Sequence, residues 1–498
     1  MNVKEITKEP CIDVGVMTAG EISFGLQRAA YLEVYRKSKK HRLICEDKIM
    51  LPEGEYIARL EQGKLALYLE DKCLINKGDR FRFVALDAQQ EVFFRLHAVR
   101  IGIDFHWDRT QEQCFVGELH LQIDQASIIA INRLPLEDYL LSVISSEMSA
   151  KAGVELLRAH AIISRSWLLA QGLGKHLTPA SENESTSVSE NESTPLSGNT
   201  MLSENDEHIK WYERDAHTLF DVCADDHCQR YQGFALATTP QVKKALASTR
   251  GMVIACEEEI CDARFYKCCG GKTEVFEACW SDHPKPYLQS ISDCAASTKL
   301  SSANAKQMPA NTNQASVSDF ENLCDEVQAR AFICSSPEAF CHTHDKEVLQ
   351  QVLNDYDQET ADFYRWEVRY GAEELSDIVK QRSGIDFGRI KALLPVQRSH
   401  SARLVKLKIV GEKRSMVVGK ELEIRKFLSR THLYSSAFVV DEERNEQGEV
   451  ETFVLKGAGW GHGVGLCQIG AAMMSQQGYS YKDILAHYYP NTEIITLY

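Results

Sequence analysis

The hydrophobic period changes near residue 131, and this change most constrains what the chain can fold into. Before it, apolar and polar residues alternate in short runs separated by Gly and Asp, a pattern typical of strands. These runs lie at Ile12–Met17, Gly54–Leu60, Leu65–Leu69, Phe81–Leu86, Cys114–Ile123 and Ser127–Ile131. After it, Leu136–Ser149 and Val154–Gln171 each place apolar residues on one helical stripe. The pattern predicts an α+β fold in which a β-rich N-terminal portion leads into helices.

The second half of the chain continues the mixed pattern but contains two low-complexity segments. A helical run and three strands are expected at Glu347–Asp357, Phe363–Tyr370, Leu404–Val410 and Thr452–Leu455. Residues 178–205 contain SENEST twice, and residues 297–318 are rich in Ala, Ser, Asn and Gln. Such segments bury too little apolar surface to offset their ordering entropy, so both are expected to be disordered inserts. The 498 residues then divide into a β-rich portion at 1–110 and a larger domain at 111–498.

Charge and cysteine content narrow the classes of partner. The chain has 56 Lys and Arg against 71 Asp and Glu, and a net charge of −15 argues against nucleic acid. No run approaches about 20 consecutive apolar residues, so no integral membrane segment is expected. Residues 1–20 also lack the apolar stretch of an export signal. The 16 cysteines are therefore expected to be reduced thiols, metal ligands or core residues rather than a disulfide framework.

One short segment, HTLFDVCADDHC, concentrates side chains that suit zinc: His217, Cys223, His227 and Cys228. Two imidazoles and two thiolates complete a tetrahedral shell, and a closed shell has a structural rather than a catalytic role. The adjacent His227 and Cys228 depart from the usual zinc-finger spacings. Core cysteines with surface histidines explain the same residues equally well.

A second cysteine feature is the pair Cys268 and Cys269, which is followed directly by two glycines. Adjacent cysteines could bind a metal or form a redox pair. A tight turn after a strand is the commoner explanation, and no neighbouring base that would activate a thiol is evident.

Glycines alternate with larger residues in GAGWGHGVGLCQIGAAMM. The segment lacks the Gly-Lys-Ser/Thr ending of a phosphate-binding loop, and its glycines imply a backbone that approaches something closely. Trp460 and His462 lie in this turn, and Gln468 begins the following helix. A histidine beside an aromatic residue on a glycine loop suits a carbohydrate or another polar polymer. The alternative is a close-packed turn with a structural histidine.

Two charged residues fall on apolar helical stripes. Tyr139, Val143 and Glu147 lie at i, i+4 and i+8, so the carboxylate extends a buried face and suits a general acid. Arg165 occupies a similar position in the next helical run. A buried ion pair between Glu147 and Arg165 is the alternative.

Taken together, the motifs resemble the SpoIID/LytB family, the relatives of stage II sporulation protein D. The matching blocks follow family order between about Leu134 and Ile494 and are LPLEDYLLSVISSEM, ELLRAHAIISRSWLLA, CCGGKTEVFEACW, PYLQSISD, GAGWGHGVGLCQIGAAMM and YKDILAHYYPNTEI. The resemblance implies that residues 111–498 form a SpoIID-like catalytic core. It departs from the family at Arg158-Ala159-His160-Ala161, where Lys-Ala-Gln-Ala is common.

Characterised members of this family are lytic transglycosylases, which cleave the bond between N-acetylmuramic acid and N-acetylglucosamine in peptidoglycan strands and leave 1,6-anhydro ends. The resemblance therefore implies Glu147 as the catalytic acid and base. It implies one structural zinc, and the expected ligands are His217, Cys223, His227 and Cys228. It also implies a sugar-binding groove lined by Arg165, Trp460, His462 and Gln468.

Two other interpretations of the function remain. A non-catalytic wall-binding module that stimulates a cell-wall amidase, as proposed for LytB-like relatives, is the main alternative, and it would add that amidase to the glycan strands as a partner. A zinc protein without a role in the wall is a third. The family acts in the cell envelope or periplasm, whereas no signal peptide is visible in this chain.

Overall fold

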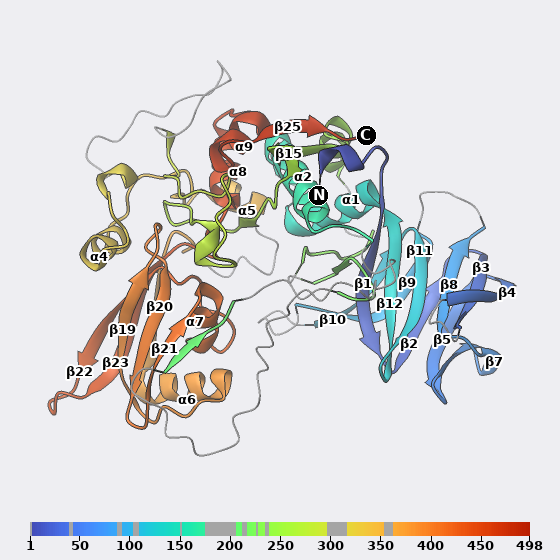
Figure 1. Cartoon of the computed structure of the whole chain (residues 1–498), viewed down its shortest axis with the longest axis horizontal. Helices are drawn as coiled ribbons and strands as arrows, with labels where there is room; N and C mark the ends of the chain where they lie inside the picture. The colour runs from blue at the N-terminus through green and yellow to red at the C-terminus, as the bar shows by residue number, and fades with distance from the viewer. Residues whose placement is uncertain are drawn as a thin grey trace.

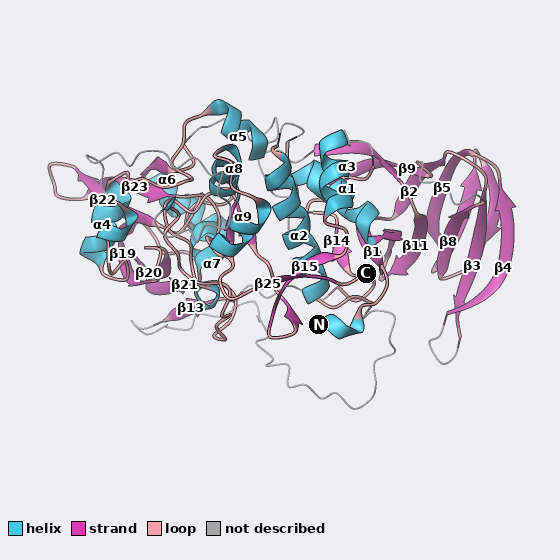
Figure 2. Ribbon diagram, turned by 90° about the horizontal axis from the view of Figure 1, so that it is seen from above, coloured by secondary structure: helices cyan, strands magenta, loops and turns pink. Residues whose placement is uncertain are grey.

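The computed structural model describes residues 2–498 with gaps at 39–42, 87–91, 103–108, 150–151, 175–205, 212–216, 226–227, 235–238, 296–315 and 353–361. The fold is α+β, as predicted (Figures 1 and 2). Both low-complexity inserts lie outside the described residues, apart from residues 316–318 at the start of a short 3-10 helix. In the part of the chain that is described, no helix is long and apolar enough to cross a membrane.

Two sheets pack against each other at the N-terminal end of the molecule, drawn in blue and cyan in Figure 1. The first has the order β14-β1-β12-β11-β8-β3-β4, with bounds Val222–Cys223, Cys11–Ala19, Ser127–Pro135, Glu118–Asp124, Arg80–Ala85, Ala30–Lys37 and Leu43–Leu51. The second has the order β10-β9-β2-β5-β6-β7, with bounds Arg109–Phe115, Phe94–Ile101, Glu21–Leu26, Gly54–Glu61, Lys64–Leu69 and Lys72–Asn76. Phe24 of β2 meets Phe83 of β8 edge to face at 5.1 Å, so their apolar faces share one core.

The expected strand at Cys114–Ile123 is wrong, because the chain turns inside it. β10 ends at Phe115 in the second sheet, and β11 begins at Glu118 in the first. Gly117 between them has φ +80°, and a Cβ there would lie 2.4 Å from the carbonyl oxygen of Arg133. Only glycine fits this crossing. Both sheets continue across residue 110, so the N-terminal strands and the following segment form one packed unit.

Helices and short strands form a central layer beside the two sheets (Figure 2). Both helical runs predicted around residues 136–171 are confirmed as α1 (Leu136–Glu147) and α2 (Val154–Ala170). α2 is buried almost all round, since it contacts α1, α3, α8, α9 and β15. The other elements of this layer are α3 (Pro240–Ser248), α5 (Lys346–Val352), α8 (Gln468–Gln476), α9 (Tyr481–Tyr488), β15 (Met252–Cys256), β16 (Glu259–Ile260), β25 (Glu493–Thr496), β17 (Phe265–Tyr266) and β24 (Leu466–Cys467).

A second hydrophobic core lies at the other end of the molecule, drawn in orange in Figure 1. Its sheets have the orders β18-β23-β22 and β13-β21-β20-β19. Their bounds are Arg365–Gly371, Val450–Ala458, Phe438–Arg444, Glu207–Ile209, Ser415–Gly419, Leu404–Gly411 and Ile390–Arg398. The helices of this end are α4 (Glu326–Cys334), α6 (Ala372–Ser383) and α7 (Glu421–Phe427). β23 runs directly into the glycine loop, which brings this end of the molecule against the central layer.

Candidate functional site

Glu147 is the last residue of α1 and is half-buried. The helix ends there because Met148 adopts an extended conformation, with φ −117° and ψ 146°. The Glu147 carboxylate accepts a hydrogen bond from the backbone N–H of Arg230, with 3.1 Å between Oε1 and N. A segment far away in the sequence therefore orients this carboxyl group.

The segment that supplies this N–H also carries the predicted zinc ligands. His217, Cys223 and Cys228 place their ligand atoms within 4.8 Å of one another, and His217 Nε2 lies 3.4 Å from Cys228 Sγ. An imidazole nitrogen and two sulfurs at this spacing fit a tetrahedral zinc site. The fourth expected ligand, His227, lies outside the described residues. Three of the four predicted side chains are thus brought together.

Hydrogen bonds and ring stacking fix the residues after Cys228 against α1 and α2. Gln229 accepts from the hydroxyl of Tyr139 and donates to the carbonyl of Ser164, each at 3.2 Å. Tyr231 stacks on Tyr139 with 5.3 Å between ring centroids, and its hydroxyl donates to Asn132 Oδ1 at 2.5 Å. These contacts hold the Arg230 N–H in place beside Glu147.

A pocket of about 520 Å³ adjoins the same segment. Arg230 and Cys223 form part of its wall, and other lining residues come from β1, β9 and β10. Its lining includes the amide side chains of Gln113 and Gln232. Both amide atoms of Gln113 and Nε2 of Gln232 are buried without a hydrogen-bond partner among the described residues. Phe220 adds an aromatic surface to the same pocket.

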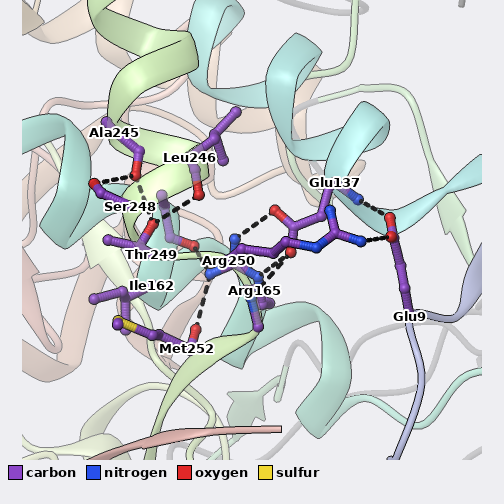
Figure 3. A network of polar contacts seen from close by, with 12 residues as sticks. Glu9, Glu137, Ile162, Arg165, Ala245, Leu246, Ser248, Thr249, Arg250 and Met252 are labelled. Carbon is purple, nitrogen blue, oxygen red and sulfur yellow. Dashed lines mark hydrogen bonds and ion pairs between the residues drawn. The ribbon is translucent and has the colours of Figure 1, made fainter. Parts of the chain in front are cut away.

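Arg165, expected near the substrate, is instead completely buried in an ion pair with Glu137 (Figure 3). The guanidinium donates to both carboxylate oxygens, at 2.9 and 2.7 Å, and to the carbonyl of Met252 at 2.8 Å. The buried ion pair considered from sequence is therefore present, but its carboxylate is Glu137 rather than Glu147. Full burial gives Arg165 a packing role and counts against a place in the wall of an open groove.

Gln468 is also buried, at 2% exposure, and its Nε2 lies 3.2 Å from Nε2 of His160. His160 in turn lies 3.1 Å from Ser164 Oγ through its Nδ1. Burial and the nearby Lys267 lower the pKa of His160 to about 3, so the imidazole is neutral at pH 7. The amide can then donate to Nε2 while Nδ1–H donates to the hydroxyl, which makes a closed buried chain.

His462 lies in the glycine loop and is held by backbone groups on both ring nitrogens. Nδ1 accepts from the N–H of Val464, and Nε2 donates to the carbonyl of Phe265, each at 3.1 Å. Burial, with Arg264 as the first of several nearby cations, lowers the pKa of His462 well below its usual value. This geometry fits a neutral structural histidine, the alternative considered from sequence.

The backbone of the loop glycines lies close to other parts of the protein itself. Gly463 has φ +88°, and a Cβ on it would lie 2.5 Å from Cζ of Arg403. Trp460 is half-buried, and its ring packs on Tyr434 and Phe363 with centroid distances of 4.2 and 4.8 Å. The glycines therefore serve internal packing around the loop.

Sequence reasoning missed Arg230, Gln113 and Gln232. Arg230 acts through its backbone N–H, and every non-proline residue has one, so no side-chain pattern signals it. The two glutamines become notable only because the fold buries them in a pocket wall.

Comparisons with known proteins show which family the chain is similar to. The family profile described as Stage II sporulation protein matches residues 124–255, which include α1, α2, the segment of the predicted zinc ligands and most of β15. A domain family of unknown function, DUF8618, matches residues 274–465. Stage II sporulation protein D of Bacillus amyloliquefaciens is 23% identical over 366 residues, covering 73% of this chain and 75% of that protein. The same protein of Bacillus subtilis (strain 168) is 20% identical, covering 73% of this chain and 76% of its own length. Residues 124–255 therefore match a SpoIID domain, and the chain is similar to stage II sporulation protein D over 73% of its length.

Proposed function

We propose that the chain is a peptidoglycan lytic transglycosylase that uses Glu147 as general acid and base. It would cleave the bond between N-acetylmuramic acid and N-acetylglucosamine and leave 1,6-anhydro ends. The match of residues 124–255 to the SpoIID family model, with the similarity to stage II sporulation protein D over 73% of the chain, supports a sporulation-related, cell-wall lytic role. The observation that carries the finer proposal is the half-buried Glu147 carboxylate, which is oriented by a backbone N–H from the pocket wall.

A single carboxyl group is enough for this reaction. Hydrolytic glycosidases commonly use two carboxylates, because besides the acid that protonates the leaving oxygen a second one either activates water or attacks the sugar carbon as the nucleophile. In a lytic transglycosylase the 6-hydroxyl of the sugar replaces that water. Glu147 donates its proton to the glycosidic oxygen as the C1–O bond breaks, and the resulting carboxylate accepts the proton of the 6-hydroxyl as the O6–C1 bond forms. The carboxyl group returns to its starting state, and no water is consumed.

The pocket beside Arg230 suits a neutral sugar polymer. Gln113 and Gln232 contribute to its lining, and each would have to turn its buried, unpartnered amide atoms toward the pocket to bond hydroxyl and acetamido groups. The ring of Phe220 offers an apolar surface for a sugar face. Both features are typical of sites that bind uncharged polar ligands mostly through shape and hydrogen bonds.

His217, Cys223 and Cys228 would hold the zinc ion, with His227 as the fourth ligand. The donor set fits, because one imidazole nitrogen and two thiol sulfurs already lie within 4.8 Å of one another. A zinc ion bound there would supply a structural cross-link. The chain's own contribution is the ordered run from Gln229 to Tyr231, which presents the Arg230 N–H to Glu147.

The test of Glu147 is the variant Glu147→Gln, with Glu53→Gln on an exposed turn as matched control. Purified glycan strands are incubated with each protein, and anhydro-ended products are quantified by mass spectrometry. Loss of a general acid and base should reduce the rate about 10²–10⁴-fold, while the control keeps the wild-type rate. Undiminished turnover by a folded Glu147→Gln variant would refute this assignment.

The same assay separates the enzyme from the alternative function. An amidase enhancer would release no anhydro ends by itself and would accelerate stem-peptide removal by an added cell-wall amidase. That result, with Glu147→Gln as active as wild type in the stimulation assay, would replace the present proposal with the binding-module function.

A further inference from the structure

Three buried cysteines and a buried carboxylate meet in the central layer, away from the predicted zinc ligands. Cys269, Cys341, Cys467 and Asp293 have all their ligand atoms within 4.8 Å of one another. Cys269 Sγ lies 3.2 Å from Cys341 Sγ and 3.2 Å from Asp293 Oδ2. We propose that these four residues, called here the buried thiol cluster, form a second metal site that binds one structural zinc ion.

The fold brings the cluster together from four segments far apart in the sequence. β17 and β24 pair in parallel, with Tyr266 opposite Cys467, which sets Cys467 beside the turn that carries Cys269. The backbone N–H of Asp293 donates to Gly271 at 2.9 Å, and Phe340 donates to the carbonyl of Asp293 at 2.7 Å. Backbone pairing therefore brings these segments side by side, and hydrogen bonds to the thiols add to it.

The sulfurs are surrounded by backbone donors. Cys467 Sγ accepts from the N–H groups of Cys269 and Gly470, at 3.3 and 3.4 Å. Cys269 Sγ accepts from the N–H of Gly271 at 3.3 Å. Cys467 also caps the N-terminus of α8, where the helix dipole favours negative charge. Such donors favour thiolate sulfur, the form that binds metal.

The carboxylate is oriented in the way that metal ligands commonly are. Asp293 Oδ2 faces Cys269 and accepts the N–H of Cys341 at 3.1 Å, while Oδ1 accepts the hydroxyl of Tyr488 at 2.6 Å. Gly470 leaves the necessary room, because a Cβ there would lie 2.2 Å from the Tyr488 hydroxyl and 2.8 Å from Oδ2. The second oxygen and its hydroxyl partner thus hold the first oxygen toward the sulfurs.

Zinc explains this donor set better than a disulfide does. With Zn–S bonds of about 2.3 Å, tetrahedral sulfurs lie about 3.8 Å apart, so the cluster needs to open by only a few tenths of an ångström. A disulfide between Cys269 and Cys341 would leave Cys467 unused and would leave the fully buried Asp293 carboxylate with His487, whose Nε2 lies 3.6 Å from Oδ1, as its cationic partner. Three thiolates and one carboxylate around Zn²⁺ use every member, and binding releases the thiol protons to solvent.

The cluster also lies in a segment with little regular secondary structure, which a metal cross-link would stabilise. The residues between β17 and α4 contain turns and isolated bridges, and the only helices among those described there are short 3-10 turns. No side of the cluster is open to solvent, since all four residues are buried. A fully buried, closed shell stabilises structure and leaves no position for a substrate.

The test measures metal in the full-length protein, purified under reducing conditions with zinc present. The variant Cys223→Ser/Cys228→Ser removes ligands of the first site and should retain about one equivalent of zinc by plasma mass spectrometry. Cys269→Ser/Cys467→Ser should lose that equivalent, whereas Cys261→Ser, at a buried cysteine outside the cluster, should keep it. Glycan cleavage is not the readout, so the result is independent of the proposed enzyme activity.

If Cys269→Ser/Cys467→Ser does not fold, cobalt binding to the other double variant tests the second metal site. Cobalt added to the apo form of folded Cys223→Ser/Cys228→Ser should give thiolate-to-cobalt charge-transfer bands and the intense visible bands of a tetrahedral site. A folded Cys223→Ser/Cys228→Ser protein that binds neither metal would overturn the proposal. So would a Cys269–Cys341 disulfide found by non-reducing peptide mapping of the freshly purified protein.

Discussion

The two interpretations of Arg165 make opposite predictions for the variant Arg165→Met. If the residue holds the fold together, the free energy of unfolding should fall, because Glu137 is left with a buried charge. Removing one partner of a buried ion pair costs about 3–5 kcal/mol. We expect the lower end of that range here, since Glu137 still accepts from the hydroxyl of Tyr498 at 2.8 Å and from the N–H of Gly251 at 3.3 Å.

The converse variant, Glu137→Ala, should cost more, near the upper end of that range. It would leave a guanidinium with no exposed surface and, among the described residues, only the carbonyls of Met252 and Ala161 as acceptors. Urea unfolding followed by far-UV circular dichroism measures both variants and the double variant. A positive coupling energy of about 2 kcal/mol or more is expected, as for contacting buried charges. A stable Arg165→Met protein, destabilised by less than about 1 kcal/mol but unable to cleave glycan strands, would refute this reasoning and restore the substrate-binding role.

Two further predictions concern protonation and backbone conformation. The pKa of His160 is lowered to about 3 in the folded protein. Between about pH 6.5 and 3, His160 is therefore protonated in the unfolded chain but neutral in the folded protein. The free energy of unfolding falls as the pH is lowered through that range. At pH 5 the free energy of unfolding is lower by about 2 kcal/mol than at pH 7 because of this residue. His160→Gln, which introduces the residue common in the family, should remove that difference, as measured by urea unfolding at the two pH values. An unchanged pH dependence would show that His160 is already charged in the folded protein. Gly463→Ala should lower the melting temperature, at a cost of about 2–4 kcal/mol, because its φ is +88° and the new Cβ meets Arg403. Gly20→Ala, where nothing lies within 4 Å, should change stability by less than about 1 kcal/mol, and equal effects at both sites would contradict the steric argument.

Local periodicity predicted those elements whose two faces differ in burial. α1 matches the expected run at its first residue and ends within two residues of it, because one apolar stripe packs against other elements along the whole length. α2 matches as closely, although it is buried almost all round. β4, Leu43–Leu51, was not predicted, since it is an edge strand exposed on both faces along most of its length and carries no alternation. The break at Gly117 was missed because apolar residues keep the same alternation on both sides of it, at Phe115 and at Leu119 and Leu121. The contact that a Cβ at Gly117 would make with the Arg133 carbonyl reveals the turn.

Chemistry was predictable from sequence where the side chains are close together in the chain. His217, Cys223 and Cys228 are within twelve residues of one another, and they do meet. Arg165 and Gln468 were assigned to a sugar-binding groove through the family resemblance. Their burial became visible only once α2 was seen to be surrounded by packed elements.

Chain entropy explains why one proposed set of metal ligands can be recognised from the sequence and the other cannot. Residues 217 and 228 close a loop of 11 residues, whereas residues 269 and 467 are 198 positions apart. Closing the longer loop in a flexible chain costs about 2.5 kcal/mol more, from (3/2)RT ln(198/11). A short motif can organise its own site, but the buried thiol cluster depends on β17, β24 and the surrounding core to bring its ligands together first. Its ligands therefore have no fixed spacing to recognise, and the chain's unusual cysteines at 269, 341 and 467 acquire a common explanation only from the tertiary structure.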